Sequence, residues 1–387
     1  MHVLRVAQKV YPDVEGGLPY HVHAMSRDQA AMGHDVTVLT VRQDPSPPKT
    51  ETRDGYRLVR FDPRANLIGN QIAPGLARRL LKTDGFDVVH AHSHIYFATN
   101  LAAAIARYRD LPLAITNHGM YSQSVSKRVF SVYLKTLGRW TFNQADVVFC
   151  YTEGGRERTE RIGVTAPIDV VANGIDETRF TPDGRESDAL GGEGPTVLAV
   201  LRLKDGKRPA DAIEVIDRVR DRHPTAGLYL AGDGPLRERL ERTVARRGLE
   251  DAVTFLGSVP YDEMPALYRA CDAIVHPSEA EGGSPRVILE AMAAGRPFVA
   301  TDLEHFSPSI ADVGRMRPVG HVDGMAEDLT ELLSDPNRRR RLGERGRRLV
   351  ESAFSWRSTV EGTTETLERL CESADWPRTA ARPPGQR

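Results

Sequence analysis

Short apolar runs alternate with longer segments of helical periodicity along most of the chain. Runs such as VTVL and DVVH lack the polar–apolar alternation of a strand that is buried on one face only. They are typical of parallel strands that helices cover on both sides. The first half predicts strands at HVLRVAQ, HDVTVLTV, YRLVRF, FDVVHAH, LPLAIT, ADVVFCY and IDVVA, with helices between most of them. This order predicts an α/β fold with a doubly wound sheet.

The segment 181–195, TPDGRESDALGGEGP, interrupts the alternation. Proline, glycine and acidic residues dominate it and no periodicity remains, so we interpret it as an interdomain linker. Strand–helix alternation then restarts at TVLAVLRL. We therefore expect two Rossmann-like, doubly wound domains, residues 1–180 and 196–354, that face a cleft, and a disordered tail at 373–387. Ligands of such sheets bind at the carboxyl ends of the strands, so the loops there are the candidate sites.

The composition excludes several classes of function. The chain has 387 residues, 40% of them hydrophobic and 27% charged, which is typical of a globular protein. A net charge of −1 lacks the basic excess of a nucleic-acid-binding protein. Cys150, Cys271 and Cys371 are odd in number and widely spaced, which fits neither a disulfide framework nor a zinc site. The sequence shows no signal peptide and no transmembrane run, so we expect a cytoplasmic protein.

A polar loop precedes an apolar helix in HPSEAEGGSPRVILEAMAAG, which begins at His276. Gly282 and Gly283 leave bare backbone amides before the helix, and such amides bind anions. Glu290 is a carboxylate among apolar neighbours, and its burial requires hydrogen-bond partners. A diol such as a ribose would supply two donors. A neighbouring backbone group or a basic residue would also serve, and the sequence leaves both interpretations open.

Two cations follow the first strand of the second half. Arg202 comes just after that strand, and Lys207 precedes the next helix. Two cations fixed at a strand end suit a diphosphate, because arginine binds oxygens bidentately and lysine acts as a point charge. The alternative is a pair of solvated loop cations, and the spacing alone does not decide between them.

Other loops at strand ends carry glycines and histidines. Gly16 and Gly17 follow the first strand without forming a G-x-G-x-x-G motif, and they permit either a tight turn or the close approach of a ligand. His92 and His118 follow strands of the first domain and would point toward the cleft, although a single histidine often has a structural role. The sequence contains no D-x-D pair, P-loop, G-x-S-x-G elbow or His/Cys metal cluster.

Several motifs, taken in order, resemble one known family. They are GHDVTVLT after the first helix, DVVHAHSH, TNHG, NGIDETRF, LRLKDGK, LAGDGPLRERL, FLGSV, ACDAIVHPS, EGGSPRVILEAMAAGRPFVAT and a late FSW. Together they resemble the retaining nucleotide-sugar glycosyltransferases of family 4, which have the GT-B fold. The matches extend along nearly the whole chain. The resemblance implies that a C-terminal helix at 355–372 crosses back to the first domain.

The resemblance implies catalytic roles for particular residues. Arg202 and Lys207 would clamp the diphosphate of the donor, so that no metal ion or other cofactor would be required. Glu281 and His118 would lie beside the transferred sugar. One departure affects Glu281, because eight residues separate it from Glu290, one more than is usual in the family. The extra residue would reshape the loop that faces the sugar.

The same resemblance implies a set of donor-binding residues. Glu290 would hold the ribose hydroxyls, and the loop from Gly257 to Val259 would face the base. Gly16 and Gly17 would let the backbone approach the phosphate and the acceptor. The full expected set is Gly16, Gly17, Asn173, Gly257, Val259, Gly282, Gly283 and Glu290.

The expected reaction moves a sugar from a nucleoside diphosphate sugar to an acceptor hydroxyl with retention of anomeric configuration. The acceptor would be a sugar, a lipid-linked compound or a small molecule, as in polysaccharide or glycolipid biosynthesis. Two alternatives stay open. One is another GT-B reaction on a sugar nucleotide, such as epimerisation, and the other is a sugar-nucleotide-binding module whose catalytic loop has degenerated.

The segment 126–142, SKRVFSVYLKTLGRWTF, mixes basic and aromatic residues at helical spacing. Such a helix could lie on the inner face of a membrane that holds a lipid-linked acceptor, which would make the protein peripherally membrane-bound. The alternative is an ordinary amphipathic helix that packs on its sheet.

Overall fold

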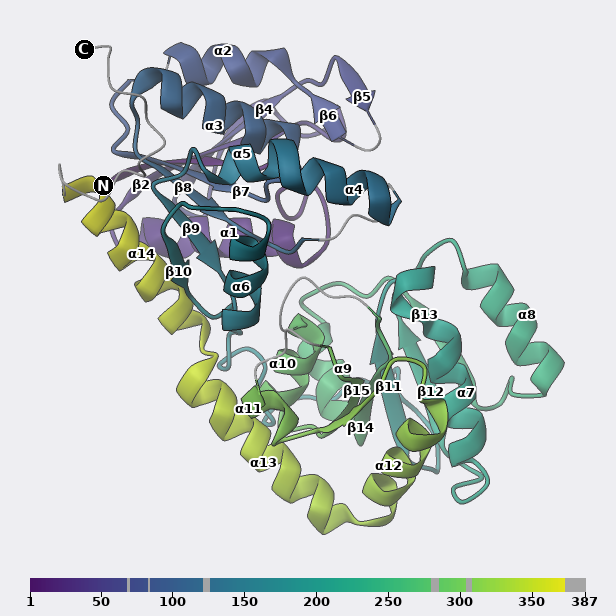
Figure 1. The fold of residues 1–387 in the computed structure, drawn as a ribbon. Coiled ribbons are helices and arrows are strands. Elements are labelled where there is room, and N and C mark those ends of the chain that lie inside the picture. The colour runs from purple at the N-terminus through teal and green to yellow at the C-terminus, as the bar shows by residue number, and fades with distance from the viewer. Residues whose placement is uncertain (68–69, 83, 121–125, 280–284, 304–307, 373–387) are drawn as a thin grey trace. The chain divides into compact units, whose positions relative to one another are not determined.

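The computed structural model describes residues 1–67, 70–82, 84–120, 126–279, 285–303 and 308–372. The chain divides into two compact units (Figure 1). The first unit contains Met1–Ala172 together with the residues from Thr359 onward, and the second contains Asn173–Ser358. Residues 181–195 form no helix or strand. They belong to the second unit and are bonded to the rest of it, for example by the hydrogen bond from the Arg269 side chain to the Arg185 carbonyl oxygen (2.8 Å).

The described residues of the first unit form an eight-stranded sheet in the order β10-β9-β8-β7-β1-β2-β4-β3. Its strands are β1 (His2–Val6), β2 (Asp35–Val41), β3 (Thr50–Arg53), β4 (Tyr56–Phe61), β7 (Val88–His92), β8 (Leu113–Thr116), β9 (Val147–Cys150) and β10 (Ile168–Val170). Neighbouring strands are parallel except β3 and β4, which are antiparallel. A separate ribbon pairs β5 (Ala65–Leu67) with β6 (Asn70–Ile72).

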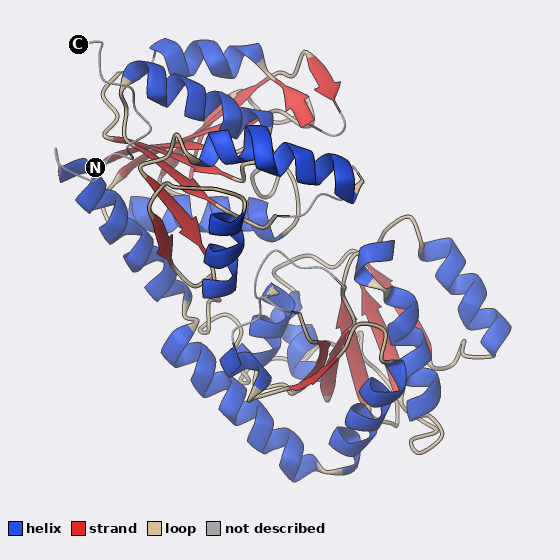
Figure 2. Ribbon diagram, in the orientation of Figure 1, coloured by secondary structure: helices blue, strands red, loops and turns tan. Residues whose placement is uncertain are grey.

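Helices cover both faces of this sheet (Figure 2). They are α1 (Gly17–Ala31), α2 (Pro74–Lys82), α3 (Phe97–Arg109), α4 (Lys127–Tyr133), α5 (Arg139–Phe142), α6 (Glu153–Arg161) and α14 (Trp356–Glu372), with a π-helical turn at Leu134–Gly138. Successive residues of β1 point to opposite faces. Leu4 packs in a core with α2 and α3, whereas Val3 packs in a core with α1 and α14. Burial on both faces explains why the strands have continuous apolar sequences.

The last helix belongs to the first unit. Leu367 and Leu370 of α14 pack in the same core as Val3. The Gln29 side chain of α1 also donates a hydrogen bond to Thr364 Oγ1 (2.9 Å). The return of the C-terminal helix to the first domain, which the family resemblance implied, is confirmed.

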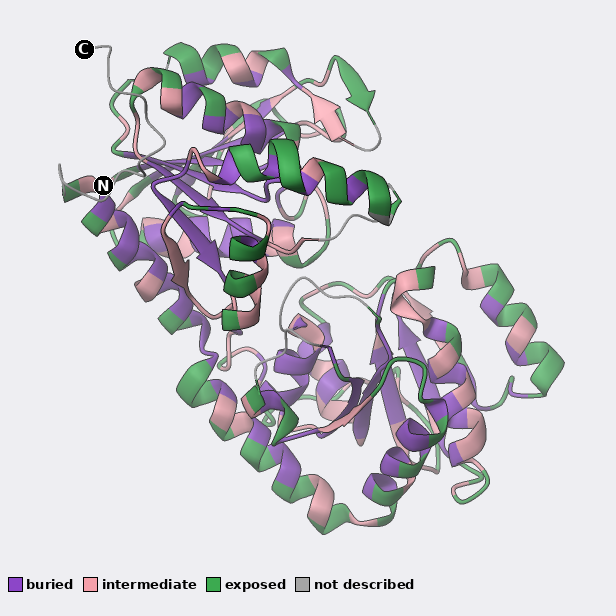
Figure 3. Ribbon diagram, in the orientation of Figure 1, coloured by how far each residue is buried: buried purple, intermediate pink, exposed green. Residues whose placement is uncertain are grey.

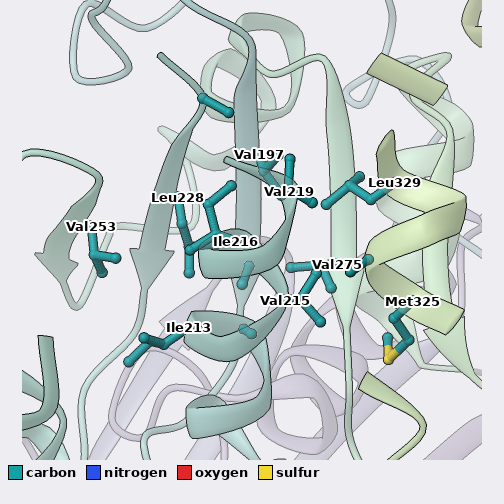
Figure 4. Close-up of a cluster of buried hydrophobic side chains, with 14 of the residues drawn as sticks. Val197, Ile213, Val215, Ile216, Val219, Leu228, Val253, Val275, Met325 and Leu329 are labelled. Carbon is teal, nitrogen blue, oxygen red and sulfur yellow. The ribbon is translucent and has the colours of Figure 1, made fainter. Parts of the chain in front are cut away.

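Within the described part of the second unit, six parallel strands have the order β13-β12-β11-β14-β15-β16. They are β11 (Thr196–Val200), β12 (Gly227–Ala231), β13 (Val253–Gly257), β14 (Ala273–His276), β15 (Phe298–Thr301) and β16 (Arg315–Arg317). The helices are α7 (Pro209–Val219), α8 (Arg237–Arg247), α9 (Met264–Ala270), α10 (Arg286–Ala293), α11 (Pro308–Ala311), α12 (Val322–Ser334) and α13 (Pro336–Ala353). Figure 4 shows one core, where Ile213, Ile216 and Val219 of α7 recur at helical spacing beside Val197 and Leu228 of the sheet.

Each sheet has a switch point, where the strand order reverses. It lies between β11 and β14 in the second unit and between β1 and β7 in the first. Ligands of doubly wound sheets bind outside the carboxyl ends of the strands at such a point. The loops after these four strands are therefore the places where the fold favours a ligand.

The α/β class with two doubly wound, parallel sheets is confirmed, and so are the strands that the apolar runs predict. The runs do not predict β3, β5 and β6, because these short strands are polar and mostly exposed or half-buried. Among the described residues, no helix is long and apolar enough to cross a membrane.

Candidate active site

Arg202 and Lys207 flank the loop after β11, at the switch point of the second unit. A single turn of 3-10 helix, Asp205–Lys207, fills this loop before α7 begins. Arg202 is exposed, and its side chain has no hydrogen bond or ion pair with the residues that the structure describes. The N-cap of α7 is Arg208 in a left-handed conformation, and no side chain caps the helix. An uncompensated cation beside an uncapped helix N-terminus suits a phosphate.

Backbone hydrogen bonds join this loop to the neighbouring strand ends. The amide of Leu203 donates to the carbonyl oxygen of Asp233 (3.0 Å), and the amide of Gly232 donates to that of Gly257 (2.7 Å). Gly232 has a φ of 135°, and a Cβ atom there would collide with the backbone of Leu201. The carboxyl ends of β11, β12 and β13 therefore form one continuous rim, and Gly257 lies on it.

The loop after β14 meets the same rim. The amide of Glu279 donates to the carbonyl oxygen of Gly206 (3.2 Å), and its carboxylate lies 3.6 Å from the Arg208 guanidinium. Three of the expected site residues follow in this loop, namely Glu281, Gly282 and Gly283, and they lie outside the described residues. Their roles stay predictions.

Glu290 lies in α10 with only 4% of its surface exposed. The Tyr268 hydroxyl donates to its Oε2 (2.8 Å) and the Tyr261 hydroxyl to its Oε1 (3.2 Å). Arg286, one helical turn earlier, places Nε 3.6 Å from Oε1. Burial and the charge of Glu290 raise the pKa of Tyr268 well above its usual value, which keeps this phenol a donor. The carboxylate thus has a basic partner inside the protein, and ribose binding through its remaining lone pairs stays a prediction.

Gly16 and Gly17 lie at the start of α1, in the loop that follows β1 at the switch point of the first unit. Both glycines are exposed. Gly16 is the N-cap with a φ of 136°, a conformation that favours glycine, and no side chain caps the helix. The uncapped end of this 15-residue helix carries the positive end of the helix dipole.

Aromatic side chains from four elements converge near His118, just beyond the end of β8. His92, the last residue of β7, places Nδ1 3.0 Å from Nε2 of His118, and the Tyr151 hydroxyl lies 2.8 Å from His118 Nδ1. The His21 ring of α1 lies 5.1 Å from the His118 ring, and the His90 ring lies 4.3 Å from that of His92. The fold therefore brings together the two histidines, His92 and His118, that the sequence singles out.

Burial keeps these imidazoles neutral. It lowers the pKa of His90, His92 and His118 well below the usual value for histidine. The charge of Arg5 lowers the pKa of His90 further, and Arg5 Nη2 lies 3.4 Å from His90 Nδ1. Arg5 is itself fully buried, and burial lowers its pKa to about 9. A neutral imidazole can donate from one nitrogen and accept at the other, and in His118 these two nitrogens face His92 and Tyr151. A role of His118 beside the transferred sugar stays a prediction.

Two family profiles match the chain. The profile described as Glycosyltransferase Family 4 matches residues 15–179, and that described as Glycosyl transferases group 1 matches residues 181–349. A glycogen synthase of Mycobacterium tuberculosis is 31% identical to the chain over an alignment of 400 positions, gaps included. The alignment covers 94% of this chain and 94% of that protein. The chain belongs to the family 4 glycosyltransferases.

Other similar proteins agree with the family and its fold. A GDP-mannose-dependent alpha-(1-6)-phosphatidylinositol monomannoside mannosyltransferase of Mycolicibacterium smegmatis is 26% identical, over 92% of this chain and 96% of that protein. Sucrose-phosphate synthase of Thermosynechococcus elongatus has a TM-score of 0.76 at 20% identity, over 95% of this chain and 98% of its own. Anabaena HepE in complex with UDP-glucose has a TM-score of 0.76 at 19% identity, over 95% and 100% of the two chains. These similarities show the GT-B fold.

In this glycosyltransferase, the described site residues fall into two groups. The first unit carries Gly16, Gly17 and His118, and the second carries Asn173, Arg202, Lys207, Gly257, Val259 and Glu290. Arg202, Lys207 and Gly257 share the rim at the strand ends. Asn173 and Val259 are half-buried, and the roles of all these residues in binding and catalysis stay predictions.

Sequence reasoning missed the side chains that hold the site residues in place. Tyr261 and Tyr268 precede Glu290 by 29 and 22 residues, so no local pattern links them to it. Arg286 lies four residues before Glu290, and helical spacing could have identified that pair. Tyr151 is the last residue of a predicted strand, as His92 is, so the position that singles out His92 could also have identified Tyr151.

Three histidines of the first unit also have the arrangement of metal ligands. Among the described residues, His21, His92 and His118 form such a group, with nitrogen atoms within 4.8 Å of one another. Both ring nitrogens of His118 already have partners in His92 and Tyr151. The expectation that the reaction needs no metal ion stays a prediction.

The segment 126–142 forms α4, the π-helical turn and α5. Phe130, Leu134 and Phe142 are buried in the unit. Much of α4 and of the turn that follows it is coloured as exposed in Figure 3. Its exposed apolar side chains are Val129 (58% exposed), Val132 (65%), Leu137 (43%) and Trp140 (40%). The helix therefore packs on its unit, as an ordinary amphipathic helix does, and in addition presents an apolar surface to solvent.

Proposed function

We propose that this glycosyltransferase transfers a sugar from a nucleoside diphosphate sugar to an acceptor hydroxyl with retention of anomeric configuration. The observation that carries the proposal is Arg202, an exposed cation beside Lys207 at the switch point of the second unit, with no ion pair among the described residues. A diphosphate is the group that such a pair of cations suits. Similar proteins add support, since HepE was solved with UDP-glucose and the M. smegmatis relative is GDP-mannose-dependent.

The proposed role of the cations follows from where charge develops. Cleavage of the bond between the anomeric carbon and the phosphate oxygen builds positive charge on the sugar and negative charge on the diphosphate. Arg202, Lys207 and the uncapped N-terminus of α7 would stabilise the leaving diphosphate without having to reorganise. Because these groups neutralise the leaving group, the reaction would need no metal ion, which is otherwise a common means of doing so.

Retention would follow from attack on the face that the diphosphate leaves. The acceptor oxygen forms the new bond to the anomeric carbon, the bond from that carbon to the phosphate oxygen breaks, and the acceptor proton passes to the departing phosphate oxygen. His118 would contact the transferred sugar near the anomeric carbon and help to orient it. Glu290 would bind the ribose hydroxyls, and Glu281 would lie near the sugar.

A donor panel and a product analysis test this function. Thermal shifts are measured with UDP-, GDP- and ADP-sugars, and we expect one nucleotide series to raise the melting temperature. Transfer is then followed with sugar acceptors, and proton NMR gives the anomeric configuration of the first product. A product of inverted configuration would overturn retention. Stabilisation without transfer or donor hydrolysis would indicate a binding module, and epimerised donor in the absence of acceptor would indicate an epimerase.

We also propose that the segment 126–142 rests on an anionic membrane surface. Arg128, Lys135 and Arg139 are exposed on this segment, which contains no acidic residue. A basic helix with an exposed apolar side binds at the interface of a membrane that contains anionic lipids. The name of the M. smegmatis relative specifies a phosphatidylinositol-based acceptor, which agrees with such a location.

A further inference from the structure

A pocket lies in the first unit, among residues that have no assigned role in sugar transfer. Its volume is about 540 Å³, which is within the range of small-molecule sites. The end of β4, the residues leading into β3 and the first turn of α2 line it. The strands β4, β2 and β1 are neighbours and run parallel, so their carboxyl ends lie at the same end of the sheet. The pocket therefore lies at the end of the sheet that also carries Gly16 and His92.

Positive side chains dominate the lining of this pocket. Its charged residues are Lys49, Arg60, Arg64 and Arg78, with Asp62 as the one acid. Two of the four cations already have carboxylate partners. Arg60 is fully buried and donates to Asp13 (2.5 and 2.9 Å) and Glu51 (2.8 Å), and Lys49 lies 2.6 Å from Asp62. The charge that remains uncompensated belongs to the other two.

Arg64 and Arg78 approach the pocket from different elements. Arg64 follows β4 and Arg78 lies on α2, and both are exposed. Neither side chain has a hydrogen bond or ion pair with the residues that the structure describes. Two guanidinium groups that line one pocket suit a phosphate, because each can present a planar fork of donors to its oxygens.

The rest of the lining suits the body of a sugar. Val59 and Phe61 are half-buried and supply apolar surface, and Thr50 supplies a hydroxyl group. Apolar walls with a few polar groups are typical of small-molecule sites. The lining thus contains two arginines, apolar surface and a hydroxyl group, a composition that suits a phosphorylated sugar.

We propose that this pocket binds a phosphorylated sugar, with the phosphate held between Arg64 and Arg78. The phosphate is inferred from the charges of the pocket. The inference that the ligand is a sugar rests on the proposed function. The ligand could be an anionic acceptor, because the ends of β1 and β4 are two strands, about 10 Å, apart along one edge. It could also be an effector that binds without being consumed. The acceptor and the effector would share the same chemistry, that of a phosphorylated sugar.

Calorimetric titration of the full chain without any donor tests the pocket. The probes are glucose 1-phosphate, glucose 6-phosphate, inorganic phosphate and free glucose. We expect both hexose phosphates to bind more tightly than free glucose, and their affinity to fall as salt is raised. The double variant Arg64→Gln/Arg78→Gln should bind them on the order of 100-fold more weakly, because two charge-assisted contacts are lost.

A matched variant controls for the general loss of positive charge. Arg57→Gln removes an exposed arginine of β4 that does not line the pocket, and it should bind like the parent protein. Equal binding of glucose and its phosphates, or unchanged binding by the folded double variant, would overturn the proposal. Circular dichroism confirms that the variants are folded.

A transfer assay then distinguishes an acceptor from an effector. Glycosylation of the hexose phosphate in step with donor consumption identifies an acceptor. A changed rate on another acceptor, with the hexose phosphate left intact, identifies an effector. Binding of the hexose phosphate is measured without donor. A failure to bind would therefore contradict the proposed pocket without contradicting the proposed transfer reaction. Conversely, phosphate binding without any transfer would contradict the proposed function and leave the pocket supported.

Discussion

His94 is a titratable residue whose pKa is shifted by burial and by no charged group among the described residues. It is fully buried and its ring lies 4.5 Å from that of Phe142. Within the described residues, neither of its ring nitrogens has a hydrogen-bond partner. Burial alone lowers its pKa to about 3. Because the unfolded chain would protonate His94 first as the pH falls, the residue makes folding stability depend on acidity.

Replacement of His94 by phenylalanine should flatten that dependence. The folded pKa lies below the unfolded value of 6.5, so the stability present above pH 6.5 is lost progressively as the pH falls toward 3. At pH 5 this loss amounts to about 2 kcal/mol for one histidine, and His94→Phe should avoid it. Urea denaturation at pH 7.5 and pH 5 measures the difference, and an equal acid loss in both proteins would contradict the assignment.

Individual residues also show where sequence reasoning reaches its limit. The run NRRRRLGERGRR indicates a solvated helix face, and Arg340 and Arg341 of α13 are indeed exposed. Arg347, however, donates to the carbonyl oxygens of Glu177, Phe180 and Ala293 at 2.7–2.9 Å. These acceptors lie far away in the sequence, so no local pattern distinguishes this arginine from its neighbours.

At the scale of elements, the continuous apolar runs identify the strands of both sheets. Their burial on two faces leaves a strong compositional signal, and the motifs then place Arg202, His92 and His118 at strand ends. The partners of Glu290 are a different case, because Tyr268 reaches it through the packing of α9 on α10, and Tyr261 reaches it from the residues that precede α9. Such contacts depend on tertiary structure and could not be predicted from periodicity.

The helix of residues 126–142 provides a test at this scale. Val129→Glu/Val132→Glu places two charges on its exposed apolar side, and it should reduce binding to vesicles of anionic phospholipids by at least roughly tenfold. Vesicle sedimentation measures the bound fraction. Val319→Glu changes an exposed apolar residue of the second unit and serves as the matched control. Equal sedimentation of all three proteins would argue against the membrane surface.

At the scale of the whole molecule, each unit has its own switch point and its own part of the predicted chemistry. The first unit carries uncharged histidines, and the second carries the cations and the carboxylate of Glu290. In the proposed mechanism, the groups that would stabilise a leaving diphosphate are therefore built from the chain itself. This assignment leads directly to an expectation about metal ions.

Chelation should leave the transfer rate unchanged. In the proposed mechanism, Arg202, Lys207 and the N-terminus of α7 would supply the positive charge that a metal ion would otherwise provide. Initial rates are compared before and after dialysis against excess EDTA, with a metal-dependent glycosyltransferase treated in parallel. Loss of activity that added Mg²⁺ or Mn²⁺ restores would contradict the metal-free mechanism.

The kinetics of Arg202→Ala test most directly whether the loop after β11 holds the leaving diphosphate. Arg222→Ala, which removes an exposed arginine beyond the end of α7, is the control. The account predicts that kcat of Arg202→Ala falls by about 10²–10³-fold while its melting temperature and the control's turnover stay unchanged. Parent-like turnover of Arg202→Ala would contradict it.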